Sequence, residues 1–161
     1  MDERLLLEIL QKDARISESN IAKMLSASEA DVRKKVDELK KSGVIRAFTT
    51  YVDWEKQGEE NITAYIYVKV TPQERTGFDK LGEELAANPK VEEVFVTSGD
   101  YDLTVKIKAK DIRDVSNFVT ETLAPKRGVM STSTHFVMKK FKESGVVLTD
   151  AAKEKKLVIS A

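Results

Sequence analysis

The sequence of 161 residues predicts an α+β protein with three helices in its N-terminal part and a βαββαβ order after them. Two observations lead to this prediction. Up to about residue 43, apolar residues recur at the i, i+3, i+4 spacing of helices. From residue 62 onward, segments with alternating apolar and polar residues are separated by further segments of helical spacing. With 41% apolar and 34% charged residues, the chain is hydrophobic enough to fold and long enough for two small domains.

The first three predicted helices have recognisable ends. Ser17 is the expected N-cap of the second helix, because its hydroxyl can accept a backbone N–H that lacks a partner. Ser28 is expected to cap the third helix, and Asp31 completes a capping box in which Asp replaces the usual Glu or Gln. Gly43 is the expected terminator of the third helix. The first helix is predicted over residues 2–12 by its apolar positions Leu5, Leu6, Ile9 and Leu10.

A β-branched and aromatic segment, VIRAFTTYVDWE at residues 44–55, follows the third helix and predicts a strand. Three helices followed by a strand are the order of a winged helix-turn-helix unit. We therefore predict a helix-turn-helix DNA-binding domain over residues 1–48. Residues 49–61, with polar residues around Gly58 to Asn61, are predicted to be a strand and hinge linker.

The remaining elements are predicted in the βαββαβ order of the ferredoxin-like fold. The strands are expected at residues 62–70, 91–98, 101–109 and 129–142, and the helices at 73–88 and 111–124. Such a sheet has helices on one face and leaves the other available for a partner. This domain is assigned to residues 62–143 and a tail to 144–161, whose KKLVIS end is expected to be one more edge strand. The inward positions expected on the second helix are Ile112, Val115, Phe118, Val119 and Leu123.

The charge distribution points to the third helix, although the total charge does not. The formal net charge is +0, so the bulk balance does not argue for nucleic acid. Six basic residues nevertheless lie between residues 33 and 46, opposed by Asp37 and Glu38. A helix that reads DNA would present its first turns to base edges, where Arg33 and Lys34 could reach guanine or phosphate. The candidate DNA-binding residues are Ser28, Glu29, Ala30, Arg33, Lys34, Asp37, Lys40, Lys41 and Arg46.

This pattern alone also fits an ordinary helical hairpin with a solvated basic face. Two positions depart from the usual motif. Ser26 stands in the turn where many such units have Gly, and a non-glycine residue with positive φ costs on the order of 1 kcal/mol. Ala27 stands where a larger apolar residue is common.

Several classes of site and location are not expected. The chain has no cysteine, which excludes disulfides and thiolate metal ligands, and its one histidine, His135, has no second imidazole nearby. We expect no metal and no cofactor. No apolar run approaches the ~20 residues that span a bilayer, and the N-terminus has no signal-peptide pattern, so a cytoplasmic protein without membrane contact is expected.

Four segments together make the chain resemble the Lrp/AsnC (feast/famine) family of bacterial and archaeal regulators. They are LLLEILQKDARIS, IAKMLSASEADVRKKVDELKKSGVI, SGDYDLTVKI and TSTHFVMKKFKE, within residues 2 to about 143. The resemblance implies a C-terminal RAM domain that forms homodimers through its open sheet face, with tetramers or octamers built from them. It also implies a small effector, usually an amino acid, bound where dimers meet. The effector-binding residues carried over by motif are Ser98, Gly99, Asp100, Tyr101, Asp102, Thr132 and Thr134.

The chemistry of this loop is suitable for an amino acid. Gly99 permits a tight turn with exposed backbone N–H groups for a carboxylate, and Asp100 offers a carboxylate for an ammonium group. Threonine hydroxyls add donors and acceptors. A plain hairpin turn is the alternative, because Gly-Asp is common in turns.

Three functions are compared. The leading hypothesis is a regulator whose dimers bind a pseudo-palindromic site in double-stranded DNA. The second is an enzyme on the same scaffold, similar to relatives that decarboxylate a modified tetrapyrrole. The single His135 and the acidic turn speak against it, so no enzyme is expected. The third is a small-molecule sensor whose helix-turn-helix has lost DNA affinity, which the departures at Ser26 and Ala27 leave open.

Overall fold

The structure, a computed structural model, describes residues 1–71 and 78–149. The chain divides into two compact units, Met1–Val52 and Asp53–Ala161, and each is described by itself. Within the described residues, no helix combines the length and the apolar character that crossing a membrane requires.

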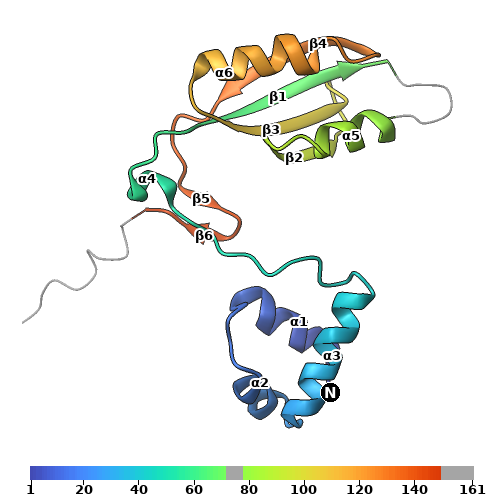
Figure 1. Cartoon of the computed structure of the whole chain (residues 1–161), viewed down its shortest axis with the longest axis vertical. Helices are drawn as coiled ribbons and strands as arrows, with labels where there is room; N and C mark the ends of the chain where they lie inside the picture. Colours follow the sequence, from blue (N-terminus) through green and yellow to red (C-terminus); the bar gives the residue numbers. More distant parts are fainter. Residues whose placement is uncertain (72–77, 150–161) are drawn as a thin grey trace, which may run out of the picture. The chain divides into compact units, whose positions relative to one another are not determined.

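The first unit is a bundle of three helices, α1 (Glu3–Lys12), α2 (Glu18–Leu25) and α3 (Glu29–Lys41) (Figure 1). The predicted caps are confirmed. Ser17 accepts the N–H of Asn20, and Ser28 accepts the N–H of Asp31. The Ser28 hydroxyl also donates to the Asp31 carboxylate at 2.7 Å, so the Asp31 side chain bonds to the Ser28 side chain and not to the Ser28 backbone N–H that a capping box uses. Gly43 follows the C-cap of α3 with φ 76°, as expected for a terminator. The buried core is Leu6, Ile9, Leu10, Ile21, Ala22, Val32 and Leu39.

The strand predicted over residues 44–55 is wrong, and the described residues form no wing strand. Residues 46–53 have no regular structure, and a short helix, α4 (Trp54–Gln57), follows. The reason is that a strand needs a neighbour for its hydrogen bonds, and no described segment pairs with this one. Phe48 is accordingly 46% exposed. The Asp53 side chain instead accepts the N–H of Lys56 and caps α4.

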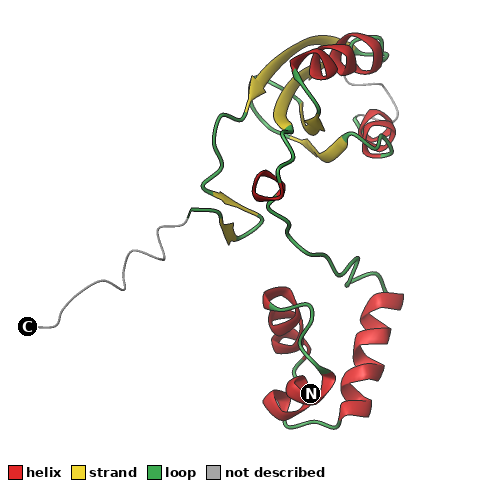
Figure 2. Ribbon diagram, turned by 60° about the vertical axis from the view of Figure 1, so that its left-hand side comes forward, coloured by secondary structure: helices red, strands yellow, loops and turns green. Residues whose placement is uncertain are grey.

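The second unit contains a four-stranded antiparallel sheet in the order β2-β3-β1-β4, which confirms the predicted ferredoxin-like arrangement. The strands are β1 (Ile62–Val70), β2 (Val91–Val96), β3 (Leu103–Ala109) and β4 (Val129–Phe136). The helices are α5 (Asp79–Ala86) and α6 (Ile112–Asn117), the latter continuing as a π-helical turn, η1 (Phe118–Leu123). Both lie on the same side of the sheet (Figure 2). The core between sheet and helices contains Ala64, Ile66, Val68, Leu81, Leu85, Leu103, Val105, Ile107, Val115, Phe118 and Leu123.

Both predicted helices of this unit differ in detail from the structure. The first was expected over residues 73–88. Its described part is α5, and residues 73–77 lie outside the described residues. Ile112 was expected to face inward but is 63% exposed, so this prediction is wrong. Ile112 is the first residue of α6, at the end of the helix, and the buried positions of the helix start only at Val115.

The last predicted strand is also shorter than expected, because β4 ends at Phe136 instead of residue 142. The chain then forms a small hairpin of β5 (Lys142–Glu143) and β6 (Val146–Val147). Its turn residues Ser144 and Gly145 both have positive φ, 48° and 82°, as a two-residue turn of type I′ requires. The strand expected at KKLVIS falls outside the described residues.

Candidate functional sites

The turn between α2 and α3 adopts the backbone that sequence analysis anticipated. Ser26 lies in the left-handed region, with φ 48° and ψ 46°, although it is not glycine. Its N–H and that of Ala27 both donate to the carbonyl of Ala22, which is buried. A left-handed residue followed by the N-cap Ser28 therefore sets the direction in which α3 leaves the turn.

Seven of the nine candidate DNA-binding residues lie on the solvent side of α3, Ser28 caps this helix, and Arg46 follows it. Val32 and Leu39 are buried and Val36 is partly buried, and they fix which side of the helix packs on the bundle. The remaining positions are left in solvent. All of the candidates are exposed, namely Ser28, Glu29, Ala30, Arg33, Lys34, Asp37, Lys40, Lys41 and Arg46. The structure thus brings them to one accessible region of this unit, and their contact with DNA stays a prediction.

The basic residues of this region are not equivalent electrostatically. The Arg33 guanidinium is bonded to the Glu18 carboxylate of α2, and this hydrogen bond holds the pKa of Glu18 below its usual value. Lys35, which is not among the candidates, pairs with Glu3 at 2.7 Å. Among the described residues, the other basic candidates have no ion partner. They are Lys34, Lys40, Lys41 and Arg46.

The predicted effector loop joins β2 to β3. Ser98, Gly99 and Asp100 are exposed, and Gly99 has φ 132°, a conformation that favours glycine. Tyr101 and Asp102 are half-buried. The loop therefore offers the Asp100 carboxylate and the backbone around Gly99 to solvent.

Asp102 has a different environment from Asp100. Its N–H donates to the carbonyl of Val68, and its carboxylate accepts the N–H of Val70 at 2.8 Å. Lys69 Nζ lies 3.6 Å from the same carboxylate. These contacts join the end of the loop to β1, next to the irregularity in the β1–β4 pairing between Lys69 and Val70. Asp102 thus holds the loop in place, and Asp100 is the carboxylate that remains exposed.

The two threonine candidates lie on the other side of the sheet from Tyr101. Thr132 and Thr134 pair directly with Val68 and Ile66, so their side chains share the helix-covered face. The Tyr101 ring instead lies 5.7 Å from that of Tyr67, on the open face. Within one chain, the seven effector candidates therefore do not meet on one face of the sheet.

An aromatic and polar patch on the open face was missed by sequence analysis. We call it the tyrosine–histidine patch, and it consists of Tyr67, Tyr101, Ser133 and His135. The rings of Tyr67 and His135 meet edge to face, with centroids 5.0 Å apart. His135 Nε2 lies 3.0 Å from the Ser133 hydroxyl. Strand alternation in β1 and β4 was the available signal, but the register that places His135 beside Tyr67 is not readable from either strand alone.

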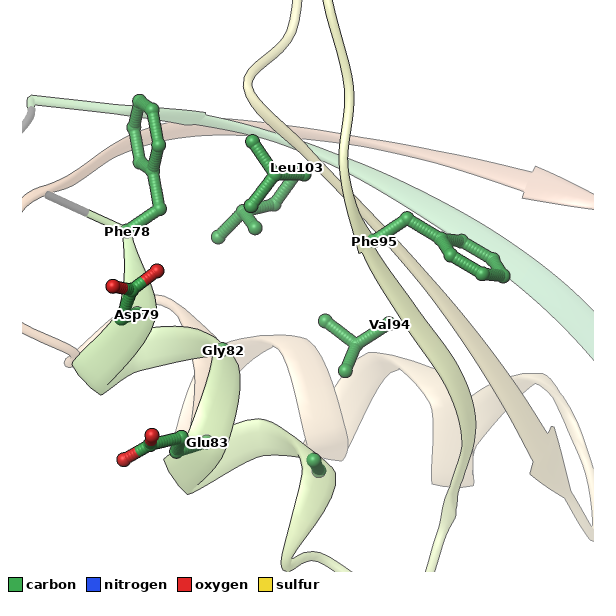
Figure 3. Close-up of a pocket in the computed structure, with 9 residues that line it drawn as sticks. Phe78, Asp79, Gly82, Glu83, Val94, Phe95 and Leu103 are labelled. Atoms are coloured by element: carbon green, nitrogen blue, oxygen red, sulfur yellow. The ribbon is translucent and has the colours of Figure 1, made fainter. Parts of the chain in front are cut away.

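A cleft of about 310 Å³ between α5 and β2 is a second feature that was not predicted (Figure 3). Phe78, Val94 and Leu103 give it apolar walls, and the carboxylates of Asp79 and Glu83 come from α5. The described lining residues include no basic side chain, so the cleft offers no cation to an amino acid's carboxylate. We therefore do not assign the effector to it.

Comparison with known proteins agrees with both units. The Lrp/AsnC ligand binding domain matches residues 63–147, and a winged helix-turn-helix DNA-binding domain matches residues 3–46. The HTH-type transcriptional regulator YugG of Bacillus subtilis is 39% identical over 156 residues, which are 96% of this chain and 94% of the relative. The regulator FL11 of Pyrococcus furiosus is 34% identical, covering 86% of this chain and 89% of its own.

A solved structure with the same fold is that of the transcriptional regulator NMB0573 of Neisseria meningitidis in complex with L-Met. Its TM-score is 0.72 at 21% identity, covering 89% of this chain and 93% of that one. The matched family models and the identity with the two curated relatives together settle the family. The chain belongs to the Lrp/AsnC family and is a helix-turn-helix transcriptional regulator with a ligand-binding domain.

Proposed function

We propose that this regulator binds DNA sequence-specifically, as a dimer that presents two α3 helices to successive major-groove faces of a pseudo-palindromic site. The observation that carries the proposal is the exposed basic side of α3, since the candidates on this helix, its cap Ser28 and the following Arg46 are all exposed. In the described part of the chain, Lys34, Lys40, Lys41 and Arg46 have no acidic partner, so their charges are available to phosphates. Phosphate contacts would supply most of the affinity and make it salt-dependent.

The test is a selection of bound DNA from a random pool, followed by titration of the selected site at several salt concentrations. The double variant Lys40→Ala, Lys41→Ala should reduce the slope of log K against log salt by roughly 0.9 for each lost phosphate contact. Lys12→Ala, at the exposed end of α1, is the control and should leave the slope unchanged. Equal slopes for all three proteins would contradict the placement of DNA along α3.

The same selection separates this proposal from a sensor that does not bind DNA. A protein that binds an amino acid but enriches no DNA sequence would act through protein partners instead. The proposed activity is binding and not catalysis, and we assign no catalytic residue. A regulator of this kind works in the compartment that holds the DNA, which for a bacterial or archaeal cell is the cytoplasm.

The effector that the loop at residues 98–102 suits best is an amino acid. Asp100 would bind the α-ammonium group, and N–H groups around Gly99 would bind the carboxylate. Asp102 would keep the loop in shape through its bond to the Val70 N–H. Thr132 and Thr134 lie on the opposite face from Tyr101, which favours a site completed by another copy of the chain. The L-Met complex of a protein with the same fold agrees with an effector of this class.

Calorimetric titration with each amino acid tests this proposal. Asp100→Asn keeps the size of the side chain but removes the charge, so binding of the preferred amino acid should weaken at least tenfold, as expected for loss of a charge-assisted hydrogen bond. Asp79→Asn, an exposed carboxylate on α5, is the matched control. If Asp100→Asn binds as tightly as the control, the ammonium group is not recognised at this loop.

We further propose that the dimer forms through the open face of the sheet, and that dimers assemble into tetramers or octamers. Phe95 pairs with Thr104 on that face and is 49% exposed, and its ring points away from α5 (Figure 3). Phe95 and the tyrosine–histidine patch share the open face, with Thr104 of β3 between Phe95 and Tyr67, and a second copy would cover such a surface. Light scattering should show a smaller assembly for Phe95→Asp than for the parent chain. Unchanged mass would place the dimer interface elsewhere.

An effector acts on such a protein only through a difference in its affinity for two states. If the effector site is completed where dimers meet, an amino acid would favour one assembly over the others. The expected observation is that the preferred amino acid changes the mass of the assembly and the occupancy of the selected DNA site at the same concentrations.

A further inference from the structure

A carboxylate from α2 binds a basic side chain of α3. The Glu18 carboxylate accepts from Arg33 Nε at 3.0 Å and from Arg33 Nη2 at 2.6 Å. Glu18 is the first residue of α2, and Arg33 lies in the second turn of α3. The contact therefore joins the two helices of the helix-turn-helix through one bidentate ion pair.

The pair uses one edge of the guanidinium and leaves another open. Nε and Nη2 form the side edge, which faces Glu18. The terminal edge, made by Nη1 and the second hydrogen of Nη2, keeps a pair of parallel N–H donors. Two parallel donors are what the O6 and N7 atoms of guanine accept in the major groove. With its side chain 66% exposed, Arg33 presents this edge to solvent.

The surroundings of Arg33 suit base recognition better than phosphate binding. Glu18 cancels its charge directly, and the carboxylates of Glu29 and Asp37 raise the pKa of Arg33 further through their charges. A guanidinium among three carboxylates attracts a phosphate weakly, because the local charge is negative. Lys40 and Lys41, in the last turn of the same helix, form no ion pair with a described residue, whereas Arg33 is paired with Glu18.

We propose that Glu18 is a positioning residue that fixes Arg33 for end-on recognition of a guanine and removes its charge from phosphate binding. This inference rests on the proposed function, in which α3 lies in the major groove. In this proposal, Arg33 contributes sequence discrimination and the other basic residues of α3 contribute affinity. Exposed ion pairs add little to folding stability, so the pair can be broken without unfolding the unit.

The test uses Glu18→Gln, which keeps the shape of the side chain and removes its charge. Binding is measured to the selected site, to the same site with each guanine replaced, and to unrelated DNA, over a range of salt. Glu18→Gln should bind unrelated DNA more tightly, with a salt slope steeper by up to about 0.9, because one more cation can reach a phosphate. Discrimination against one guanine replacement should fall by about tenfold, as expected when a bidentate contact is loosened.

Two further variants separate positioning from a merely structural role. Arg33→Lys keeps the charge but lacks the fork, so it should lose the same discrimination at the same guanine. Glu8→Gln, which breaks an exposed pair with Arg4 on α1, is the control and should change neither slope nor discrimination. In an Arg33→Lys background, Glu18→Gln should cause no further loss of discrimination, because both act on one contact.

The outcomes are distinguishable. If the parent chain selects no DNA sequence, the proposed function fails and this inference fails with it. If the parent selects a site but Glu18→Gln leaves discrimination and slope unchanged, only the role of Glu18 is refuted. If Glu18→Gln weakens binding equally on every sequence, the pair supports the fold of the unit and not base choice.

Discussion

Replacing Lys106 is the substitution that tests the ligand-binding unit most directly. Lys106 lies on β3, on the open side of the sheet, yet its side chain is only 5% exposed. Its ammonium group bonds to Glu143 at 2.5 Å and Glu93 at 3.2 Å, and lies 3.3 Å from Glu92. Burial lowers the pKa of Lys106, but the hydrogen bonds to these carboxylates outweigh burial and raise the pKa above its ordinary value.

Replacing Lys106 by Met would remove the cation that Glu92, Glu93 and Glu143 share, and Glu143 would keep its bond to Lys140 at 3.0 Å. Breaking a fully buried pair costs about 3–5 kcal/mol, because a charge is left without a partner. Here the carboxylates keep access to water, since Glu143 is 17% and Glu93 is 38% exposed. We therefore expect a loss of about 1–3 kcal/mol in the free energy of unfolding, which lowers Tm by several degrees for a unit of this size. The short β5–β6 hairpin should detach first, because Glu143 belongs to it.

Thermal and urea unfolding at neutral pH measure this loss. Lys126→Met is the matched control, since Lys126 is 34% exposed and pairs with the half-exposed Glu84 at 2.8 Å. Its expected cost is much smaller, because water and salt screen an exposed pair. Because the folded pKa of Lys106 is raised, its contribution is fully present below the unfolded pKa of about 10.4 and is lost as pH rises through the folded value. Equal losses for the two variants, or a loss that varies with pH near neutrality, would refute the reasoning.

Three further variants test single features of the structure. Ser26→Gly should raise the free energy of unfolding by about 0.5 kcal/mol, because φ is 48° there; a lower midpoint in urea would show that the serine side chain is needed. Gly128→Ala should lower it by about 1–3 kcal/mol, since φ is 91° and a Cβ would lie 3.1 Å from the Thr71 carbonyl oxygen; an unchanged Tm would contradict this. Asp114 bonds to Lys90, which lowers the pKa of Asp114 below its usual value. The stabilising effect of the ionised Asp114 is present above the unfolded pKa of about 3.9 and is lost as pH falls through the folded value. The free energy of unfolding of Asp114→Asn should therefore decrease less with falling pH than that of the parent, as measured by urea unfolding between neutral and acidic pH.

Local signals predicted the helical unit well, because caps and helical spacing depend on residues a few positions apart. As predicted, Ser17 and Ser28 cap the N-termini of α2 and α3, and Gly43 follows the C-terminus of α3. The segment 44–55 could not be judged in this way, because a strand forms only when another segment pairs with it. Ile112 shows the same limit on a smaller scale, since its apolar character does not reveal that it stands at the free end of α6.

The candidate sites show the same division between local and distant information. The exposed side of α3 follows from helical spacing alone, so its residues could be predicted. The bond between Glu18 and Arg33 depends on how α2 and α3 cross, and no spacing within either helix reveals it. The burial of Lys106 depends on Glu143, 37 residues away, so no pattern within β3 reveals it.

The π-helical turn after α6 has a consequence for chain length. Its i to i+5 bonding, seen where the Ala124 N–H donates to the Val119 carbonyl, takes up one residue more than an α-helical turn. Phe118 and Leu123 are both buried although five positions separate them, a spacing that an ordinary α-helix would place on different sides. The segment between Phe118 and Leu123 thus has one residue more than a regular α-helix would need to bury both side chains on one side. Relatives one residue shorter at this point could keep the same core with a regular helix, so a single-residue gap here would be a change of helix type and not a loss of the fold.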